Sequence, residues 1–196
     1  MPKYFAFYKP FQVLSQFSSD GNKACLADYC KVAKDVYPIG RLDYDSEGLL
    51  LLSNDKSLNH QLLNPQFAHW RTYWVQVEGV ITQEAMAKLQ QGITIQIDGK
   101  PHKCLPAKAL ILQEEIAIVP PRNPPVRFRS SIPTTWISLS LQEGKNRQVR
   151  RMTAAVGFPT LRLIRMQIEQ LTLGKLQPGE LMELSQKLIY QKILGK

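Results

Sequence analysis

A continuous apolar run directly behind a polar turn most constrains how this chain can fold. Residues 49–52 are four successive leucines, and residues 40–48 before them form a short segment that begins and ends with glycine and is rich in charged side chains. An unbroken apolar run bounded by turn residues is typical of a strand buried on both faces. We therefore expect Asp43, in that turn, to lie at the end of a core strand. Taken alone, the pattern fits a solvated turn carboxylate better than a catalytic one.

The composition favours a polyanionic partner. The chain has 196 residues, 25 Lys and Arg against 16 Asp and Glu, and a formal net charge of +9. A basic surplus of this size favours nucleic acid or another polyanion without identifying it. The length suffices for one large domain, or for two small lobes with a real core.

The cysteines and the start of the chain indicate a reducing compartment. The chain has three cysteines, Cys25, Cys30 and Cys104. An odd number without a C-x-x-C pair argues against a disulfide framework or a zinc ribbon. The start of the chain lacks the features of a signal peptide, and no segment approaches the roughly 20 apolar residues of a membrane span. We expect a cytoplasmic protein that is not inserted in a membrane.

Hydrophobic periodicity predicts strands interspersed with helices. Alternating apolar residues indicate strands over 70–80 and 136–141, and an Asp98-Gly99 turn between a strand at 93–97 and a returning strand near 103–112. Helical patterns cover residues 24–33, the segment from a Ser57 cap to residue 64, the segment from a Thr82 cap to a Gly92 stop, and residues 185–194. This mixture predicts an α+β domain.

The clearest predicted helix, over residues 146–156, combines an apolar face with a basic one. Asn146 is suited to the N-cap and Gly157 to the stop. Apolar or small residues recur at helical spacing on one side, and three arginines fall on the other. The two sets are Val149, Met152, Thr153 and Val156, and Arg147, Arg150 and Arg151. Such a helix can dock on a core and direct guanidinium groups outward.

Several segments resemble the motifs of one enzyme family. Residues 40–49 read G-R-L-D-Y-D-S-E-G-L and match the pattern G-R-L-D-x-x-[ST]-x-G-L. Residues 143–152 read E-G-K-N-R-Q-V-R-R-M, a second motif of that family, and residues 8–14, Y-K-P-F-Q-V-L, are similar to its N-K-P-x-x-V-L start. The chain resembles the pseudouridine synthases of the RsuA/RluB/RluE/RluF type, and among them the short RluE-type enzymes of 23S rRNA.

The resemblance implies a fold and a function. The fold is a central, mostly antiparallel mixed sheet with flanking helices, in one catalytic domain over residues 1–196, undivided or in two lobes around a cleft. The function is conversion of uridine to pseudouridine in large-subunit (23S) rRNA, free or in the assembling subunit, with no metal, cofactor or obligate protein partner. No room precedes Lys9 for the S4 domain of larger relatives, so RNA selection is expected from the catalytic domain. Ser46, Arg71 and Arg147 replace the commoner Thr, Lys and His.

The resemblance also assigns roles to individual residues. Asp43 is the expected catalytic carboxylate, which stabilises or attacks the positive charge that develops at C1′ as a glycosidic bond breaks. Tyr73, in a strand motif K-x-Y, is expected to pack on the target base, and Arg150 to keep Asp43 ionised. Arg41 is expected to occupy the space left by the flipped nucleotide. Leu163 is expected to line the uracil pocket.

Further basic residues are expected to contact RNA. Arg165 belongs to the L-x-R stretch that begins with Leu163. Lys145, Arg147 and Arg151 are either phosphate contacts or solvated helix charges. Residues 120–133 hold five prolines and three arginines, and form either a restrained basic loop suited to grip an RNA backbone or an exposed linker. Its arginines are Arg122, Arg127 and Arg129.

Other interpretations stay open at this point. A non-catalytic RNA-binding factor in ribosome assembly would use the same basic surfaces. A nucleoside or glycoside hydrolase would need a second acid for water, for which Asp45 is a weak candidate. A calcium loop is disfavoured because its twelfth position is Asn54 rather than Glu. Tyr73 is alternatively a core aromatic on the face of its strand neighbours. The histidines, His60, His69 and His102, show no metal-ligand spacing with the cysteines.

Overall fold

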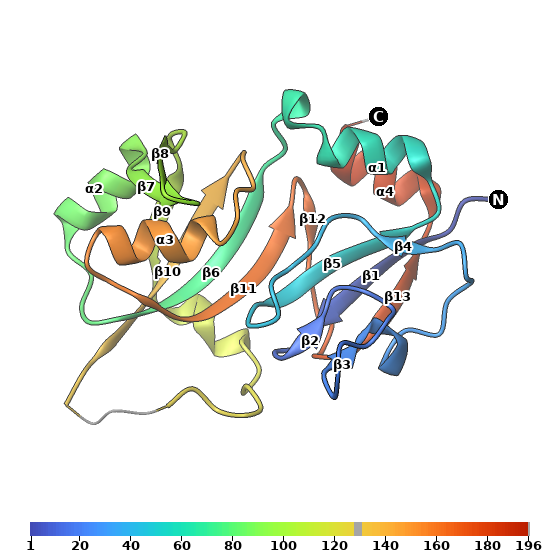
Figure 1. Ribbon diagram of the computed structural model, residues 1–196, viewed down its shortest axis with the longest axis horizontal. Coiled ribbons are helices and arrows are strands. Elements are labelled where there is room, and N and C mark those ends of the chain that lie inside the picture. Colours follow the sequence, from blue (N-terminus) through green and yellow to red (C-terminus); the bar gives the residue numbers. More distant parts are fainter. Residues whose placement is uncertain (128–130, 196) are drawn as a thin grey trace. The chain divides into compact units, whose positions relative to one another are not determined.

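The computed structural model describes residues 1–127 and 131–195, so Arg129 lies outside the described residues (Figure 1). The chain divides into two compact units, one made of Met1–His69 and Ile164–Lys196, the other of Trp70–Leu163. Strand β11 (Thr160–Ile168) contains residues of both units. Strands and helices alternate irregularly along the chain, which confirms the predicted α+β class. In the described ranges, no helix has the length and apolar character needed to cross a membrane.

The sheet of the first unit is built around β5 (Glu47–Ser53), whose seven residues are all buried. β5 pairs antiparallel with β1 (Tyr4–Lys9) and parallel with β11, where Arg165 lies opposite Gly48. β13 (Leu181–Leu184) extends the sheet beyond β1. The predicted core strand behind the Asp43 turn is therefore confirmed, and the burial of both its faces explains its unbroken apolar run.

Short elements and two helices complete the first unit. β2 (Val13–Leu14) pairs in parallel with β3 (Ala24–Cys25), β4 (Tyr37–Pro38) pairs with β5, and β12 (Leu171–Thr172) pairs with β11. The helices are α1 (Lys56–Leu63), which is followed by the 3-10 turn η2 (Pro65–Phe67), and α4 (Gln186–Leu194). The helix predicted over 185–194 is thus confirmed.

Asp55, rather than the predicted Ser57, caps α1. One carboxylate oxygen of Asp55 accepts the backbone N–H groups of Ser57 and Leu58 at 2.9 and 3.1 Å. The other oxygen accepts the hydroxyl groups of Tyr4 and Tyr190, both at 2.7 Å. A single carboxylate therefore satisfies two otherwise unpaired helix donors and joins β1, α1 and α4.

The helix predicted over residues 24–33 is wrong. A single 3-10 turn, η1 (Leu26–Asp28), forms there after β3 pairs with β2. The Asp28 carboxylate accepts the backbone N–H of Cys25 at 2.8 Å, and the buried side chains of Leu26 and Cys30 produce the helix-like spacing. Strand pairing at the start of the segment has overridden a local apolar pattern.

The second unit combines a sheet with two helices and a hairpin. Its strand order is β11, β6 (Arg71–Glu78), β10 (Thr134–Leu141) and β9 (Lys108–Leu112). The remaining elements are α2 (Gln83–Gln91), β7 (Thr94–Ile97), β8 (Lys100–Lys103), the 3-10 helix η3 (Glu114–Ile118) and α3 (Gln148–Ala155). The predicted strands over 70–80 and 136–141 are confirmed, as is the helix from Thr82 to Gly92.

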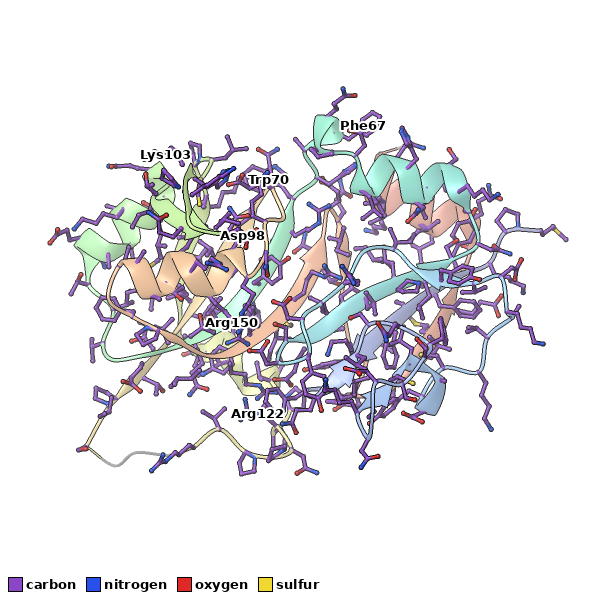
Figure 2. The ribbon with its side chains drawn as sticks, in the orientation of Figure 1. Phe67, Trp70, Asp98, Lys103, Arg122 and Arg150 are labelled. Carbon is purple, nitrogen blue, oxygen red and sulfur yellow. The ribbon has the colours of Figure 1, made fainter. Side chains whose placement is uncertain are left out.

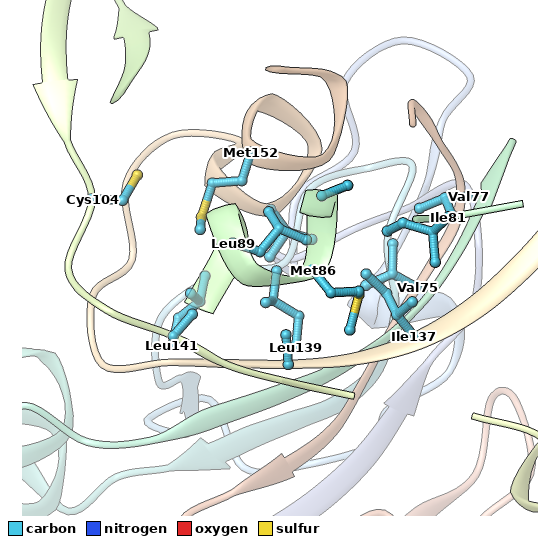
Figure 3. Packing of buried hydrophobic residues seen from close by; sticks show 14 of the residues in the cluster. Val75, Val77, Ile81, Met86, Leu89, Cys104, Ile137, Leu139, Leu141 and Met152 are labelled. Atoms are coloured by element: carbon cyan, nitrogen blue, oxygen red, sulfur yellow. The ribbon is translucent and has the colours of Figure 1, made fainter. Parts of the chain in front are cut away.

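Apolar side chains from both helices and the sheet form the core of the second unit. Figure 3 shows Leu89 of α2 and Met152 of α3 close to Leu139 of β10, and all three are fully buried. Val75 and Val77 of β6 belong to the same cluster. Truncating a leucine at such a position costs about 2–5 kcal/mol, because the cavity it leaves does not fully collapse. This core holds α3, and therefore the basic motif, on the sheet.

Two predicted boundaries in the second unit are wrong. The strand that returns from the Asp98-Gly99 turn ends at Lys103, and β9 is a separate strand that pairs with β10. The cap of α3 is Arg147, in the left-handed conformation with φ 52°, rather than Asn146. The side chain of Gln148 explains the shift, since its carbonyl oxygen accepts the backbone N–H of Lys145 at 3.0 Å and closes the turn before the helix.

Replacing Gly48 with alanine is expected to destabilise the first unit severely. Gly48 has φ +105°, and a Cβ there would lie 2.4 Å from the backbone oxygen of Arg165 and 2.6 Å from its nitrogen. Neither atom can move without breaking the β5–β11 pairing. We expect Gly48→Ala to lose at least about 2 kcal/mol in urea unfolding. Gly144→Ala, where a Cβ meets nothing within 4 Å, is the control, and an equal effect of the two would contradict this account.

Candidate active site

Asp43 lies in a turn, residues 40–46, that backbone hydrogen bonds hold at the start of β5. Ser15 clamps the residue before it, because its hydroxyl donates to the Leu42 carbonyl at 2.8 Å and accepts the Leu42 N–H at 3.0 Å. The Asp43 carbonyl accepts the backbone N–H of Ser46 at 3.0 Å, which closes the turn. We refer to residues 40–46 as the aspartate turn. Hydrogen bonds to its backbone therefore set the position of the turn.

The side chains of the aspartate turn differ in exposure. Leu42 and Ser46 are buried and anchor the turn, Asp43 and Asp45 are half-buried, and Arg41 is exposed. A carboxylate at the boundary between core and solvent, on a fixed backbone, suits a reaction at a substrate that approaches from outside. The exposed Arg41 is placed to meet an anionic ligand beside that carboxylate.

A buried lysine beneath the aspartate turn is a feature that the sequence reasoning missed. Lys9 is fully buried, and its Nζ donates to the carbonyl oxygens of Pro10 at 2.9 Å and Val13 at 2.7 Å. Burial lowers the pKa of Lys9 to about 7, while the negative charges of Glu47, Asp45 and Asp43 oppose that shift. A lysine inside an apolar strand and just before a proline was the available signal. The lysine holds the segment that follows β1 through two of its carbonyl groups.

Arg165 is buried in the first unit rather than displayed on the surface. It is 4% exposed, and its Nε donates to the carbonyl oxygen of Leu49 at 2.7 Å. This bond and the pairing of Arg165 with Gly48 both fix the first residues of β5. Arg165 therefore holds the start of β5, the strand that directly follows the aspartate turn.

Tyr73, Leu163 and Arg150 belong to the second unit. Tyr73 is half-buried on β6 and packs against the core cluster that contains the fully buried Val75 and Val77. Leu163 is itself a member of that cluster. Arg150 of α3, which Figure 2 labels, is half-buried, and its Nη1 lies 3.5 Å from the carbonyl oxygen of Thr160. Asp43 is in the other unit, so its pairing with Arg150 stays a prediction.

The remaining basic residues of the 143–152 motif divide into exposed and anchored ones. Lys145 and Arg147 are exposed. Arg151 is half-buried; its Nε donates to the carbonyl oxygen of Asn146 at 3.0 Å, and its Nη1 donates to that of Gln96. Bonds to two backbone carbonyls hold the Arg151 guanidinium at the protein surface.

A hydrogen-bonded carboxylate organises the start of the same motif. One oxygen of Glu143 accepts the backbone N–H of Leu105 at 2.8 Å and the side-chain amide of Gln148 at 2.6 Å. Its other oxygen lies 3.0 Å from Nε2 of His102. These contacts connect the segment after β8 to the turn before α3. They explain why a glutamate begins the motif.

The Glu143 cluster also corrects the expectation about histidine and cysteine spacing. The side chains of His102, Cys104 and Glu143 bring their ligand atoms within 4.8 Å of one another, although the sequence showed no ligand spacing. Burial raises the pKa of the Cys104 thiol, and its hydrogen bond with Gln148 acts in the opposite direction. The cluster has donors suited to a soft divalent cation. Since the Glu143 oxygens already accept from neighbouring groups, an ion would have to displace His102 or the amides.

The proline-rich segment is anchored by arginines. Arg122, labelled in Figure 2, donates to the carbonyl oxygens of Pro124 at 2.8 Å and Pro125 at 3.1 Å. Arg162, which sequence reasoning missed, is buried on β11 and donates to the carbonyl of Pro120 at 2.9 Å. Arg127 is exposed. The segment is therefore restrained at its start, as a loop that presents a cation requires.

Comparison with known proteins identifies the family. A family model described as RNA pseudouridylate synthase matches residues 3–155, which include the aspartate turn, β6 and α3. The chain belongs to the RNA pseudouridylate synthase family. The resemblance drawn from the two motifs is thereby confirmed, and so is the expectation of an isomerase of RNA uridine.

Individual relatives agree with this assignment. The chain is 48% identical over 182 residues to the ribosomal large subunit pseudouridine synthase E of Vibrio parahaemolyticus, covering 93% of this chain and 74% of that one. It is 47% identical over 172 residues to the corresponding enzyme of Xanthomonas axonopodis pv. citri, covering 87% of each. A crystal structure of a pseudouridylate synthase superposes with a TM-score of 0.80 at 25% identity, covering 98% of this chain and 74% of that one. This similarity confirms the predicted fold.

Replacing Lys9 with methionine is expected to change how stability depends on pH. The pKa of Lys9 is about 7 in the folded chain against 10.5 for an ordinary lysine, so between these values the unfolded state binds more protons. The contribution of Lys9 to the free energy of unfolding therefore rises with pH between these two pKa values, by up to about 1.4 kcal/mol per pH unit. In urea unfolding, the free energy of unfolding of wild type should rise relative to that of Lys9→Met as the pH is raised from 6 to 9. Parallel curves for the two proteins would contradict the buried position of the amine.

Proposed function

We propose that this chain converts a specific uridine of large-subunit (23S) ribosomal RNA to pseudouridine, with Asp43 as the catalytic carboxylate. The observation that carries the proposal is the aspartate turn, which holds Asp43 half-buried on a clamped backbone at the start of a core strand. The names of the Vibrio and Xanthomonas relatives support the large-subunit substrate. Ribosomal RNA as substrate also favours action in the cytoplasm, on free rRNA or on the assembling subunit.

The reaction is an isomerisation, so the substrate and the product contain the same atoms and no second reactant is consumed. The bond between C1′ and N1 breaks, the uracil turns, and a new bond forms between C1′ and C5. C5 then loses its proton, and N1 gains one. Positive charge develops at C1′ during the first step, and a carboxylate beside it stabilises that charge. Asp43 takes this role. No water enters the product, which separates this reaction from glycoside hydrolysis.

The other predicted residues support that step in distinct ways. Tyr73 presents a half-buried ring on β6, suited to stack on an extruded base. Arg150 provides the cation that keeps Asp43 charged. Leu163 is buried and provides apolar surface for the uracil. Arg165 contributes through β5, which it fixes from behind by its bond to Leu49.

RNA binding is assigned to the exposed cations. Arg41, Lys145, Arg147 and Arg127 are exposed, and the formal net charge is +9. Arg122 and Arg151 hold their own segments through carbonyl contacts and add positive field next to the exposed residues. Phosphate contacts of this kind position an RNA without reading its sequence, and they make binding fall steeply with salt.

Asp43→Asn is expected to abolish pseudouridine formation while leaving RNA binding intact. Removing the charge that stabilises C1′ should slow turnover by at least about 100-fold. The measurement is carbodiimide labelling and reverse transcription of unmodified rRNA treated with each protein. One new stop in large-subunit rRNA should appear with wild type and be lost in the variant.

The matched control is Asp45→Asn, which removes a half-buried carboxylate from the same turn. It should leave the stop in place. Full turnover by Asp43→Asn would refute the catalytic assignment. Tight RNA binding by wild type without any stop, on free rRNA and on immature subunits, would favour a non-catalytic assembly factor, and release of free uracil would favour a hydrolase.

A further inference from the structure

An exposed apolar patch lies at the end of α1, within the first unit. Phe67 of η2 is 48% exposed and Leu63 of α1 is 47% exposed, and the exposed His60 lies one turn before Leu63. We refer to Leu63, Phe67 and His60 as the α1 patch. A scattered exposed leucine is ordinary, whereas two large apolar side chains and an aromatic heterocycle gathered at one helix end mark a contact surface.

The ring of Phe67 is held in place while much of it stays exposed. Its centroid lies 6.1 Å from that of His60 and 6.3 Å from that of His69. His69 is itself fixed, because its Nδ1 lies 3.1 Å from Oε1 of Glu169 and its side chain is only 11% exposed. An aromatic side chain supported from two sides loses little conformational entropy when a ligand stacks on it.

The backbone around Phe67 is also set locally. The side-chain carbonyl of Asn64 accepts the N–H of Gln66 at 3.0 Å, and Pro65 begins the turn. Ala68 follows in the left-handed conformation with φ 45°, which a residue with a Cβ adopts at a cost. The turn thus presents Phe67 at its end, as Figure 2 shows.

The α1 patch adjoins the aspartate turn. A Cβ on Gly40 would lie 3.1 Å from a terminal methyl carbon of Leu63, so the helix end packs against the first residue of that turn. The next residue is the exposed Arg41. Within one unit, therefore, Leu63 of the α1 patch contacts Gly40, and the exposed Arg41 is the next residue of the chain.

An exposed aromatic ring and an exposed arginine in the same unit match the chemistry of a single-stranded nucleic acid. The base stacks on the ring and the phosphate pairs with the cation. A protein partner fits less well, since a specific interface needs about 800 Å² from each partner and the α1 patch has three side chains. We propose that Phe67 stacks on an unpaired base next to the modified uridine, with Arg41 on the adjoining phosphate. The proposal rests on the proposed function, because it assumes an RNA substrate.

Phe67→Ala is expected to weaken binding of an unmodified large-subunit rRNA transcript roughly 5- to 100-fold, the range for loss of one stacked base. The salt dependence of binding should stay as in wild type, because no charge is removed. Arg41→Gln should instead reduce the slope of log affinity against log salt by about 1. Phe67→Tyr keeps a ring and should bind like wild type.

The matched control is Tyr37→Ala. Tyr37 is an exposed aromatic of the same unit, 63% exposed, and it pairs with Ser53 at the opposite end of β5 from the aspartate turn. Thermal unfolding should confirm that Phe67→Ala remains folded. Wild-type affinity in Phe67→Ala, or an equal loss in Tyr37→Ala, would overturn the proposal. The stacking is tested by RNA binding and the proposed function by pseudouridine formation. If wild type binds RNA without forming pseudouridine, the proposed function is refuted, and the affinities of the variants still test the stacking.

Discussion

The pairing of β5 with its two neighbours is the interaction on which the rest of the candidate site depends. β5 is buried throughout, and it carries the aspartate turn at its first residue. Gly48 allows the Arg165 backbone to approach closely, and the Arg165 side chain bonds to Leu49. Because a shift of one residue would exchange the two faces of the strand, this pairing also sets where the turn begins. The position of Asp43 is therefore set by β5, the fully buried strand that follows the aspartate turn.

Buried polar groups near this strand hold the backbone of the aspartate turn and of the segment after β1. The Ser15 hydroxyl bonds to both backbone groups of Leu42, and Lys9 donates to two carbonyl groups after β1. A neutral amine has two N–H groups, enough to donate to both carbonyls. Lys9, with a pKa of about 7, can therefore keep these bonds in either protonation state. In the second unit, Glu143 plays a comparable part for the turn before α3.

Arginine has different uses at the positions that look alike in the sequence. Arg41, Arg127 and Arg147 are exposed and suit phosphate contacts. Arg162 and Arg165 are buried and donate to carbonyl groups of neighbouring segments. A planar guanidinium with five donors can serve either purpose. The proposed RNA-binding surface is therefore smaller than a count of basic residues indicates, and we propose that Phe67 extends it.

The sequence by itself determined the family, the buried strand behind Asp43, the helix from Thr82 to Gly92 and the basic helix near residues 146–156. These depend on local periodicity, capping and motif spacing, which neighbouring residues in the chain specify. The tertiary structure alone decided that residues 24–33 form a strand and a turn, that Asp55 caps α1, and that His102 lies against Glu143. It also decided which arginines are buried. These features depend on burial or on partners elsewhere in the chain, such as β2 for β3, Tyr4 and Tyr190 for Asp55, and Glu143 for His102. A linear pattern carries no record of such partners.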